Sequence, residues 1–172
     1  STLAYHLELI LHSRGCSTYV LDGDNLRMGL CADLGFSRSD RRENLRRVGE
    51  VMRLFVEAGV VVICSFISPM QADRDWLRDR LGPRRFVEVY LRCPIEVCMQ
   101  RDPKGLYDKA IRGEISDFTG ISAPYEEPEN PELIIDSDCT PVTSAAASVV
   151  RYLESAGHLS GTSPLATSYR LY

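Results

Sequence analysis

The sequence predicts an α/β fold in which helices cover both faces of a mostly parallel sheet. Short apolar segments alternate repeatedly with amphipathic ones along the 172 residues, as expected of a chain built from strand–helix units. The apolar segment 60–66, VVVICSF, is rich in β-branched residues without polar alternation, which is typical of a strand buried on both faces of a parallel sheet. We therefore expect a three-layer αβα sandwich, and 172 residues are enough for one domain with a real hydrophobic core.

Periodicity and capping residues locate the individual elements. Apolar residues recur at helical spacing in the first segment, and Ser39 or Asp40 is suited to cap the helix after the charged loop. In a later helix, Trp76 and Leu77 are expected to pack inward. The predicted elements, in order, are helix 1–14, strand 17–21, helix 39–58, strand 60–66, helix 71–81, strand 86–91, helices 94–101 and 106–112, strand 133–135 and helix 142–156.

The domain is expected to span residues 1–158, followed by a Ser/Thr/Gly-rich tail or linker at 159–172. Within the domain, segment 113–131 is rich in proline and should form a long loop. Loops of this length in a compact domain are commonly lids or binding loops.

Composition excludes several classes of function. The net charge of −4 at pH 7 argues against broad nucleic-acid binding, which normally leaves a basic surface. No apolar run reaches the ~18 residues of a membrane-spanning helix. The six cysteines form no CxxC pair, which favours free thiols in a reducing compartment. We expect a cytoplasmic protein that has neither nucleic-acid nor membrane partners.

The strand predicted at 17–21 is followed abruptly by polar residues. Asp22 and Asp24 flank a glycine, a pattern that in isolation is also common in turns. Because ligands bind at the carboxyl ends of strands in open α/β sheets, we expect a site here. The two carboxylates fit phosphoryl transfer, in which one accepts a proton from a substrate hydroxyl and either assists a metal directly or through water.

Further along, arginine and aromatic residues suggest an anionic, aromatic ligand. Arg41 and Asn44 are three residues apart, so they share a helix face near its N-terminus, where backbone N–H groups favour an anion; Arg27 precedes them. Phe36 and Phe118 lie in polar loops. Each is either a minor core contact or a stacking surface for a purine.

The first two residues, Ser1 and Thr2, allow two interpretations. They fit a helix N-cap. They also fit the end of a phosphate-binding loop, G-x-x-x-x-G-K-[ST], that is cut just after its lysine.

Five motifs together resemble the adenylylsulfate (APS) kinase family, and the resemblance extends from Ser1 to about Glu154. The motifs are LDGDNLR (21–27), LGFSRSDRRENLRR (34–47), SFISP (65–69), RDPKGLY (101–107) and FTGISAPYEEPENPEL (118–133). The resemblance implies a P-loop NTPase-type kinase. Such an enzyme transfers the γ-phosphate of ATP to the 3′-hydroxyl of adenosine 5′-phosphosulfate (APS), giving PAPS and ADP in sulfate assimilation, with Mg²⁺.

The resemblance also implies roles for individual residues on the APS side of the site. Asp22 would be the general base, with Asp24 and Lys104 as further catalytic residues. The APS-binding residues would be Arg27, Arg41 and Asn44 on the phosphosulfate, Phe36 and Phe118 on the adenine, the Ile67 backbone, and Ser68, which matches a phosphoserine position of the family.

On the ATP side, the resemblance implies that Ser1 ligates Mg²⁺ and that Thr2 lies on the phosphates. Arg101 would lie near the ATP adenine. The glycine-rich loop, its lysine and the strand before it are not in the printed chain, so we expect them upstream of Ser1. A homodimer is expected, alone or fused to an ATP sulfurylase.

Two other functions remain open from the sequence. One is a non-catalytic regulatory domain that binds PAPS or APS and is fused to an ATP sulfurylase. The other is a small P-loop kinase that acts on another nucleotide or a sugar. Catalysis is favoured over a regulatory role because the chain retains Asp22, Asp24, Arg27 and Lys104. A sugar substrate is disfavoured by the paired phenylalanines and by Arg41 and Asn44.

Overall fold

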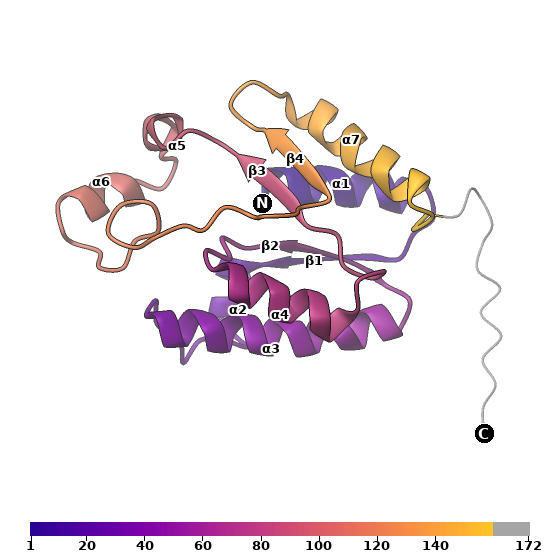
Figure 1. Cartoon of the computed structure of the whole chain (residues 1–172), viewed down its shortest axis with the longest axis horizontal. Coiled ribbons are helices and arrows are strands. Elements are labelled where there is room, and N and C mark those ends of the chain that lie inside the picture. The colour runs from indigo at the N-terminus through magenta and orange to yellow at the C-terminus, as the bar shows by residue number, and fades with distance from the viewer. Residues whose placement is uncertain (160–172) are drawn as a thin grey trace.

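Strand–helix alternation organises the chain (Figure 1). The structure is a computed structural model, and it describes residues 1–159; the predicted tail lies, apart from Leu159, outside this range. The elements are α1 (Thr2–Ser13), β1 (Thr18–Asp22), α2 (Gly23–Arg27), α3 (Arg38–Glu57), β2 (Val61–Ser65), α4 (Gln71–Leu81), β3 (Val89–Arg92), α5 (Ile95–Arg101), α6 (Leu106–Ile111), β4 (Leu133–Asp136) and α7 (Val142–Ser155).

The four strands form two parallel pairs. β1 pairs with β2, with Val20 opposite Ile63, and β3 pairs with β4, with Leu91 opposite Ile135. Both pairs are parallel, as the predicted mostly parallel sheet requires, but β2 and β3 are not hydrogen-bonded to each other. Figure 1 shows the two pairs as separate ribbons.

Helices cover both faces of the strands, which confirms the predicted α/β class. Val61 and Ile63 of β2 pack against a core built from α1, α7 and β4. Val62, between them, packs against the opposite core, which is built from α3, α4 and Leu21. Because alternate residues of a strand point to opposite faces, this division places one helical layer on each side.

A cavity of about 2050 Å³ separates the two strand pairs. Its lining includes β2 and β3 over their whole length and, at one end, Ser1 and Thr2. The continuous apolar pattern of β2 predicted burial on both faces, yet Cys64 is exposed and its neighbours in the strand are only half-buried. The reason is that β2 has a strand partner on one edge only within residues 1–159.

Several boundaries differ from those predicted. Ser37, not Ser39 or Asp40, caps α3: its Oγ accepts the Asp40 N–H at 3.2 Å. β3 begins at Val89 instead of 86, and the short helix α2 was not predicted. Trp76, expected inside, is 37% exposed.

The close approach of α3 and α4 depends on a glycine. A Cβ placed on Gly49 would lie 2.8 Å from both Leu77 Cδ2 and the Trp76 ring. The indole therefore covers α3 instead of entering the core. None of the helices within residues 1–159 is long and apolar enough to cross a membrane.

Candidate active site

Asp22 is a buried carboxylate at the carboxyl end of β1, with 6% of its surface exposed. It is the last strand residue and the N-cap of α2, where its Oδ1 accepts the N–H groups of Asp24 at 3.0 Å and Asn25 at 3.4 Å. The Ser1 hydroxyl donates to its other oxygen. Burial raises the pKa of Asp22, but these hydrogen bonds outweigh burial and lower the net pKa. Asp22 is therefore ionised at neutral pH.

Asp24 lies in a different environment, although it is only two residues away. Its side chain is 67% exposed and forms an ion pair with Lys104, which precedes α6. The contact with Asp24 raises the pKa of Lys104. The ion pair joins the segment between α5 and α6 to the start of α2.

Two arginines lie against the ring of Phe36. The Cζ atom of Arg27 is 4.3 Å from the ring centroid and that of Arg41 is 5.6 Å away. Arg27 also donates to the carbonyl of Gly35 at 2.8 Å, and Arg41 to that of Phe36 at 2.9 Å. Burial and the nearby charge of Arg27 lower the pKa of Arg41. Two cations and a half-exposed aromatic ring thus share one surface.

Asn44 lies one helical turn after Arg41 in α3 and is buried, with 4% exposed. Arg41 Nη2 donates to the carbonyl of Asp117 at 3.0 Å, which brings the long 113–131 loop beside α3. The adjacent Phe118 packs edge-on against Tyr107, with 5.0 Å between ring centroids. The sequence predicted that Phe36 and Phe118 would lie on the two sides of an adenine, and in the structure the aromatic neighbour of Phe118 is Tyr107.

A small cavity of about 190 Å³ lies where these segments meet. It is lined by Phe36, Arg41 and the loop residues Pro69 and Ser122, among others. Its walls come from α3, the Ile67–Pro69 turn and the long loop. Together they leave space beside one face of an aromatic ring.

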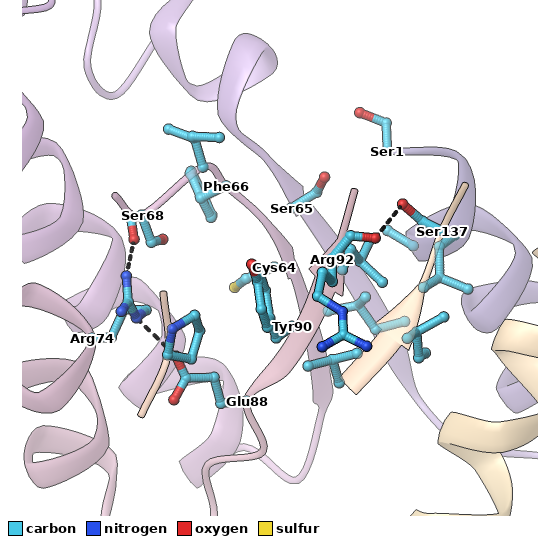
Figure 2. Close-up of a pocket in the computed structure, with 18 of the residues that line it drawn as sticks. Ser1, Cys64, Ser65, Phe66, Ser68, Arg74, Glu88, Tyr90, Arg92 and Ser137 are labelled. Carbon is cyan, nitrogen blue, oxygen red and sulfur yellow. Dashed lines mark hydrogen bonds and ion pairs between the residues drawn. The ribbon is translucent and has the colours of Figure 1, made fainter. Parts of the chain in front are cut away.

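The Ile67–Pro69 turn follows β2 and has an unusual backbone. Ser68 has a φ of +38°, a left-handed conformation that non-glycine residues rarely adopt. The Ile67 side chain is 57% exposed. Ser68 lines the large cavity, and Figure 2 shows it on the same cavity as Ser1.

The residues predicted for the ATP side also lie around the large cavity. Ser1 is the N-cap residue of α1, and its hydroxyl reaches Asp22 instead of capping the helix. Arg101, at the end of α5, donates to the carbonyls of Ser137 at 3.0 Å and Asp138 at 3.1 Å. The structure thus joins Ser1 to Asp22, whereas Arg101 is bound to the loop after β4.

The oxygen atoms near Ser1 fit a hard divalent cation. Mg²⁺ in kinases is usually held by one or two protein oxygens plus substrate phosphates. The Ser1 hydroxyl and the Asp22 carboxylate provide such oxygens side by side. Within residues 1–159 no group of three or more His, Cys, Asp or Glu side chains is placed to hold a metal ion.

Sequence reasoning missed two residues that shape this region. Tyr107, in the RDPKGLY motif, contacts Phe118. Arg74, in α4, has only 5% of its surface exposed and donates to the carbonyl of Ser68. Arg74 lies in a strongly charged helix, so a local pattern could not separate it from the solvent-facing arginines beside it.

Comparison with known proteins gives consistent results. The family model described as adenylylsulphate kinase matches residues 1–136. An adenylyl-sulfate kinase of Thermodesulfovibrio yellowstonii is 57% identical over 154 residues, which is 90% of this chain and 77% of the relative.

Two solved structures extend the comparison. APS kinase from Mycobacterium tuberculosis, solved with AMPPNP and APS, is 44% identical with a TM-score of 0.84, and 89% of each chain is covered. A hexameric APS kinase from Thiobacillus denitrificans is 28% identical with a TM-score of 0.69; the match covers 92% of this chain and 27% of that one. The chain therefore belongs to the adenylylsulfate kinase family of ATP-using, P-loop-type phosphotransferases.

Proposed function

We propose that Asp22 is the general base in the transfer of the ATP γ-phosphate to the 3′-hydroxyl of APS, giving PAPS and ADP. The observation that carries this role is an ionised, buried carboxylate at the carboxyl end of a parallel strand, next to the hydroxyl of Ser1. An anionic carboxylate accepts a proton from an alcohol that attacks a phosphoryl group. The relatives carry the name adenylyl-sulfate kinase, which favours this reaction over the regulatory and sugar-kinase alternatives.

The surface around Phe36 is proposed to bind APS. Arg27 of α2 and Arg41 of α3 supply guanidinium groups that suit the oxygens of a phosphosulfate. Asn44 lies on α3, one turn after Arg41. The exposed ring of Phe36 is proposed to stack on one face of the adenine, and Phe118 on the other once the long loop moves toward it. The 190 Å³ cavity beside Phe36 supports an aromatic ligand at this position.

The segment between α5 and α6 is proposed to close over the reacting phosphates. Lys104 is exposed and paired with Asp24, so closure brings a cation to the developing negative charge. Arg101 is proposed to lie beside the ATP adenine, since its contacts hold the loop after β4 that lines the large cavity.

Ser1 and Thr2 are proposed to face the ATP phosphates, with Ser1 as a protein ligand of Mg²⁺ and Asp22 or Asp24 near it directly or through water. The adjacent oxygens of Ser1 and Asp22 support this assignment. When bound, Mg²⁺ would neutralise charge on the transferred phosphate. Asp22 itself would take the proton of the substrate hydroxyl.

We further propose that a strand preceding Ser1 lies between β2 and β3. Both strands run parallel and offer an unpaired edge to an apolar cavity of about 2050 Å³. α1 begins at the carboxyl end of β1, where Ser1 meets Asp22. A strand that leads into α1 would run parallel to the others and end at this edge. The phosphate-binding loop would then connect that strand to Ser1.

The remaining proposals concern assembly, location and modification. We expect a homodimer in the cytoplasm, either alone or joined to an ATP sulfurylase, and a phosphorylated form at Ser68. Light scattering of the purified complete protein tests the dimer, and mass spectrometry of the peptide that contains Ser68 tests the modification.

The activity is tested on the complete protein with MgATP and APS by following ADP and PAPS formation. Asp22→Asn should lower kcat by about 10²–10⁴-fold because the general base is lost, while the melting temperature stays within a few degrees. Asp33→Asn is the matched control, because Asp33 is 61% exposed and paired with Arg47; its kcat should not change. An unchanged rate in Asp22→Asn would remove Asp22 from this role, and wild-type protein without turnover would refute the kinase.

A further inference from the structure

Arg74 is a buried cation to which no role has been assigned above. It lies in α4 with 5% of its surface exposed, and its partner Glu88, just before β3, is 9% exposed. Arg74 Nε is 2.8 Å from Glu88 Oε1. Figure 2 shows Arg74 next to Ser68, and Glu88 on the same large cavity. Burying an ion pair costs desolvation free energy unless the remaining polar atoms of both side chains also have hydrogen-bond partners. The other hydrogen-bond partners of Arg74 therefore indicate what this residue does in the fold.

The other donors of Arg74 bind the backbone of two segments that are far apart in sequence. Nη1 donates to the Ser68 carbonyl at 2.6 Å, and Nη2 donates to the Glu126 carbonyl at 2.7 Å. The two segments also meet directly, since the Glu126 N–H donates to the Pro69 carbonyl at 2.8 Å. A single guanidinium therefore joins the Ile67–Pro69 turn to the long 113–131 loop.

Ser68 adopts a conformation that needs this support. Its φ of +38° is left-handed, and the residue before a proline favours extended backbone instead. A strained backbone conformation of this kind persists only where several surrounding contacts hold it in place, and such positions are common at binding sites. Here the hydrogen bond from Arg74 fixes the Ser68 carbonyl, and burial holds the following Pro69 in place.

We infer that Arg74 is a positioning residue for APS binding. The 190 Å³ cavity takes its walls from both segments that Arg74 joins, with Pro69 and Met70 on one side and Thr119 and Ser122 on the other. Arg74 sets the distance between these walls through their backbones and does not contact the substrate. This inference rests on the proposed function, because it takes the cavity beside Phe36 as the APS subsite.

The test is Arg74→Lys in the complete protein. Lysine keeps a positive charge opposite Glu88, but its single ammonium cannot hold both carbonyls in the fixed geometry of a guanidinium. We expect KM for APS to rise about tenfold or more, while KM for ATP and kcat at saturating APS stay within about twofold. A merely structural defect would change all three constants or the amount of folded enzyme.

Arg78→Lys is the matched control. Arg78 lies one turn later in α4 and pairs with Glu88 and Glu132, so it belongs to the same ionic network but contacts neither binding segment. Its variant should leave KM for APS within about twofold of the wild type. An equal rise of KM in both variants, or an unchanged KM in Arg74→Lys, would overturn the inference.

If Arg74→Lys does not fold, Gln71→Ala replaces it. The Gln71 side-chain oxygen accepts from Arg74 Nη2 at 2.5 Å and from the Glu129 N–H of the long loop at 3.4 Å, so it orients the guanidinium against that loop. A selective rise of KM for APS supports the inference, and an unchanged KM overturns it. Calorimetric titration with APS separates the two proposals: wild-type protein that binds APS without turnover refutes the kinase, while the APS affinity of Arg74→Lys still tests Arg74.

Discussion

Asp22 and Asp24 are two residues apart, yet their surroundings differ sharply. Asp22 is buried and accepts backbone N–H groups, which stabilise its ionised form. Asp24 is exposed and paired with a cation on a separate segment. These environments separate two chemically identical carboxylates into the proposed proton acceptor and the ion-pair partner of Lys104 from the segment between α5 and α6.

The exposed pair of Asp24 and Lys104 leads to a prediction that separates activity from stability. Surface ion pairs contribute little to folding because solvent screens them. Lys104→Ala should therefore leave the melting temperature within about 2 °C but lower kcat about tenfold or more, since a cation near the transferred phosphate is lost. Steady-state kinetics and thermal melting of the complete protein measure both effects.

Lys109→Ala is the control for this experiment. Lys109 is another exposed lysine, in α6 near Lys104, and its removal should change neither kcat nor the melting temperature. Equal activity of Lys104→Ala and the wild type would show that Lys104 takes no part in the reaction.

At the scale of elements, α4 connects the two strand pairs. Its apolar side packs against α3, where Gly49 allows close approach. Its charged side reaches the second pair: Arg78 binds the Glu132 carboxylate with both Nη atoms, and the same carboxylate accepts the Glu88 N–H at 2.6 Å. The helix thus contacts the residues that lead into β3 and β4 through an ionic network.

This ionic contact predicts a dependence of stability on pH. Burial raises the pKa of Glu132, but the hydrogen bond from Arg78, the hydrogen bond from the Glu88 N–H and the charge of Arg78 together outweigh burial and lower the pKa below its usual value. The resulting stabilisation is present above the unfolded pKa of ~4.3 and is lost as pH falls through the lower folded pKa. Wild-type protein should therefore lose more stability between about pH 5 and pH 3 than Glu132→Gln, measured by urea unfolding at each pH.

Asp136→Asn provides the comparison. The side-chain contact with Arg92 also lowers the pKa of Asp136, but this pair is about half-exposed, so its contribution is screened. Its variant should follow the pH dependence of the wild type. Identical curves for the wild type and Glu132→Gln would mean that the ionic contact of α4 does not stabilise the fold.

At the scale of the molecule, the gap between β2 and β3 predicts that some backbone amides of these two strands are poorly protected from hydrogen exchange. Without a strand in the cavity, the edge N–H groups of β2 and β3 have no strand acceptors and should exchange rapidly. In a longer protein that includes the strand proposed before Ser1, the same amides should exchange slowly. Hydrogen exchange followed by mass spectrometry compares peptides 61–65 and 89–92 between the 172-residue chain and this longer protein.

Peptide 18–22 is the internal reference for this measurement. It covers β1, whose partner β2 is present in both proteins, so its exchange should differ less. Equal exchange of the β2 and β3 peptides in the two proteins would contradict a strand between them.

Local patterns in the sequence were enough to predict the α/β class and most of the helices. Helical periodicity and β-branched runs depend on residues close together in the chain, so the predicted bounds of α4 match the structure and those of α1 and α7 differ by one or two residues. The motifs were likewise enough to identify the family, because each is a short contiguous segment. The N-cap of α3 was placed two or three residues too late, because Ser37, Ser39 and Asp40 are all suitable caps and only their contacts distinguish them.

Tertiary structure alone decided which charged residues are buried and which segments meet. Arg74 is one of several arginines in a polar helix, and only the fold brings it against Ser68, Glu88 and Glu126. Strand pairing is also non-local: the run 60–66 predicts a central strand, but its number of partners depends on residues elsewhere in the chain. The pattern of β2 therefore indicated a buried strand, and the fold shows that among residues 1–159 only one of its edges is paired with another strand.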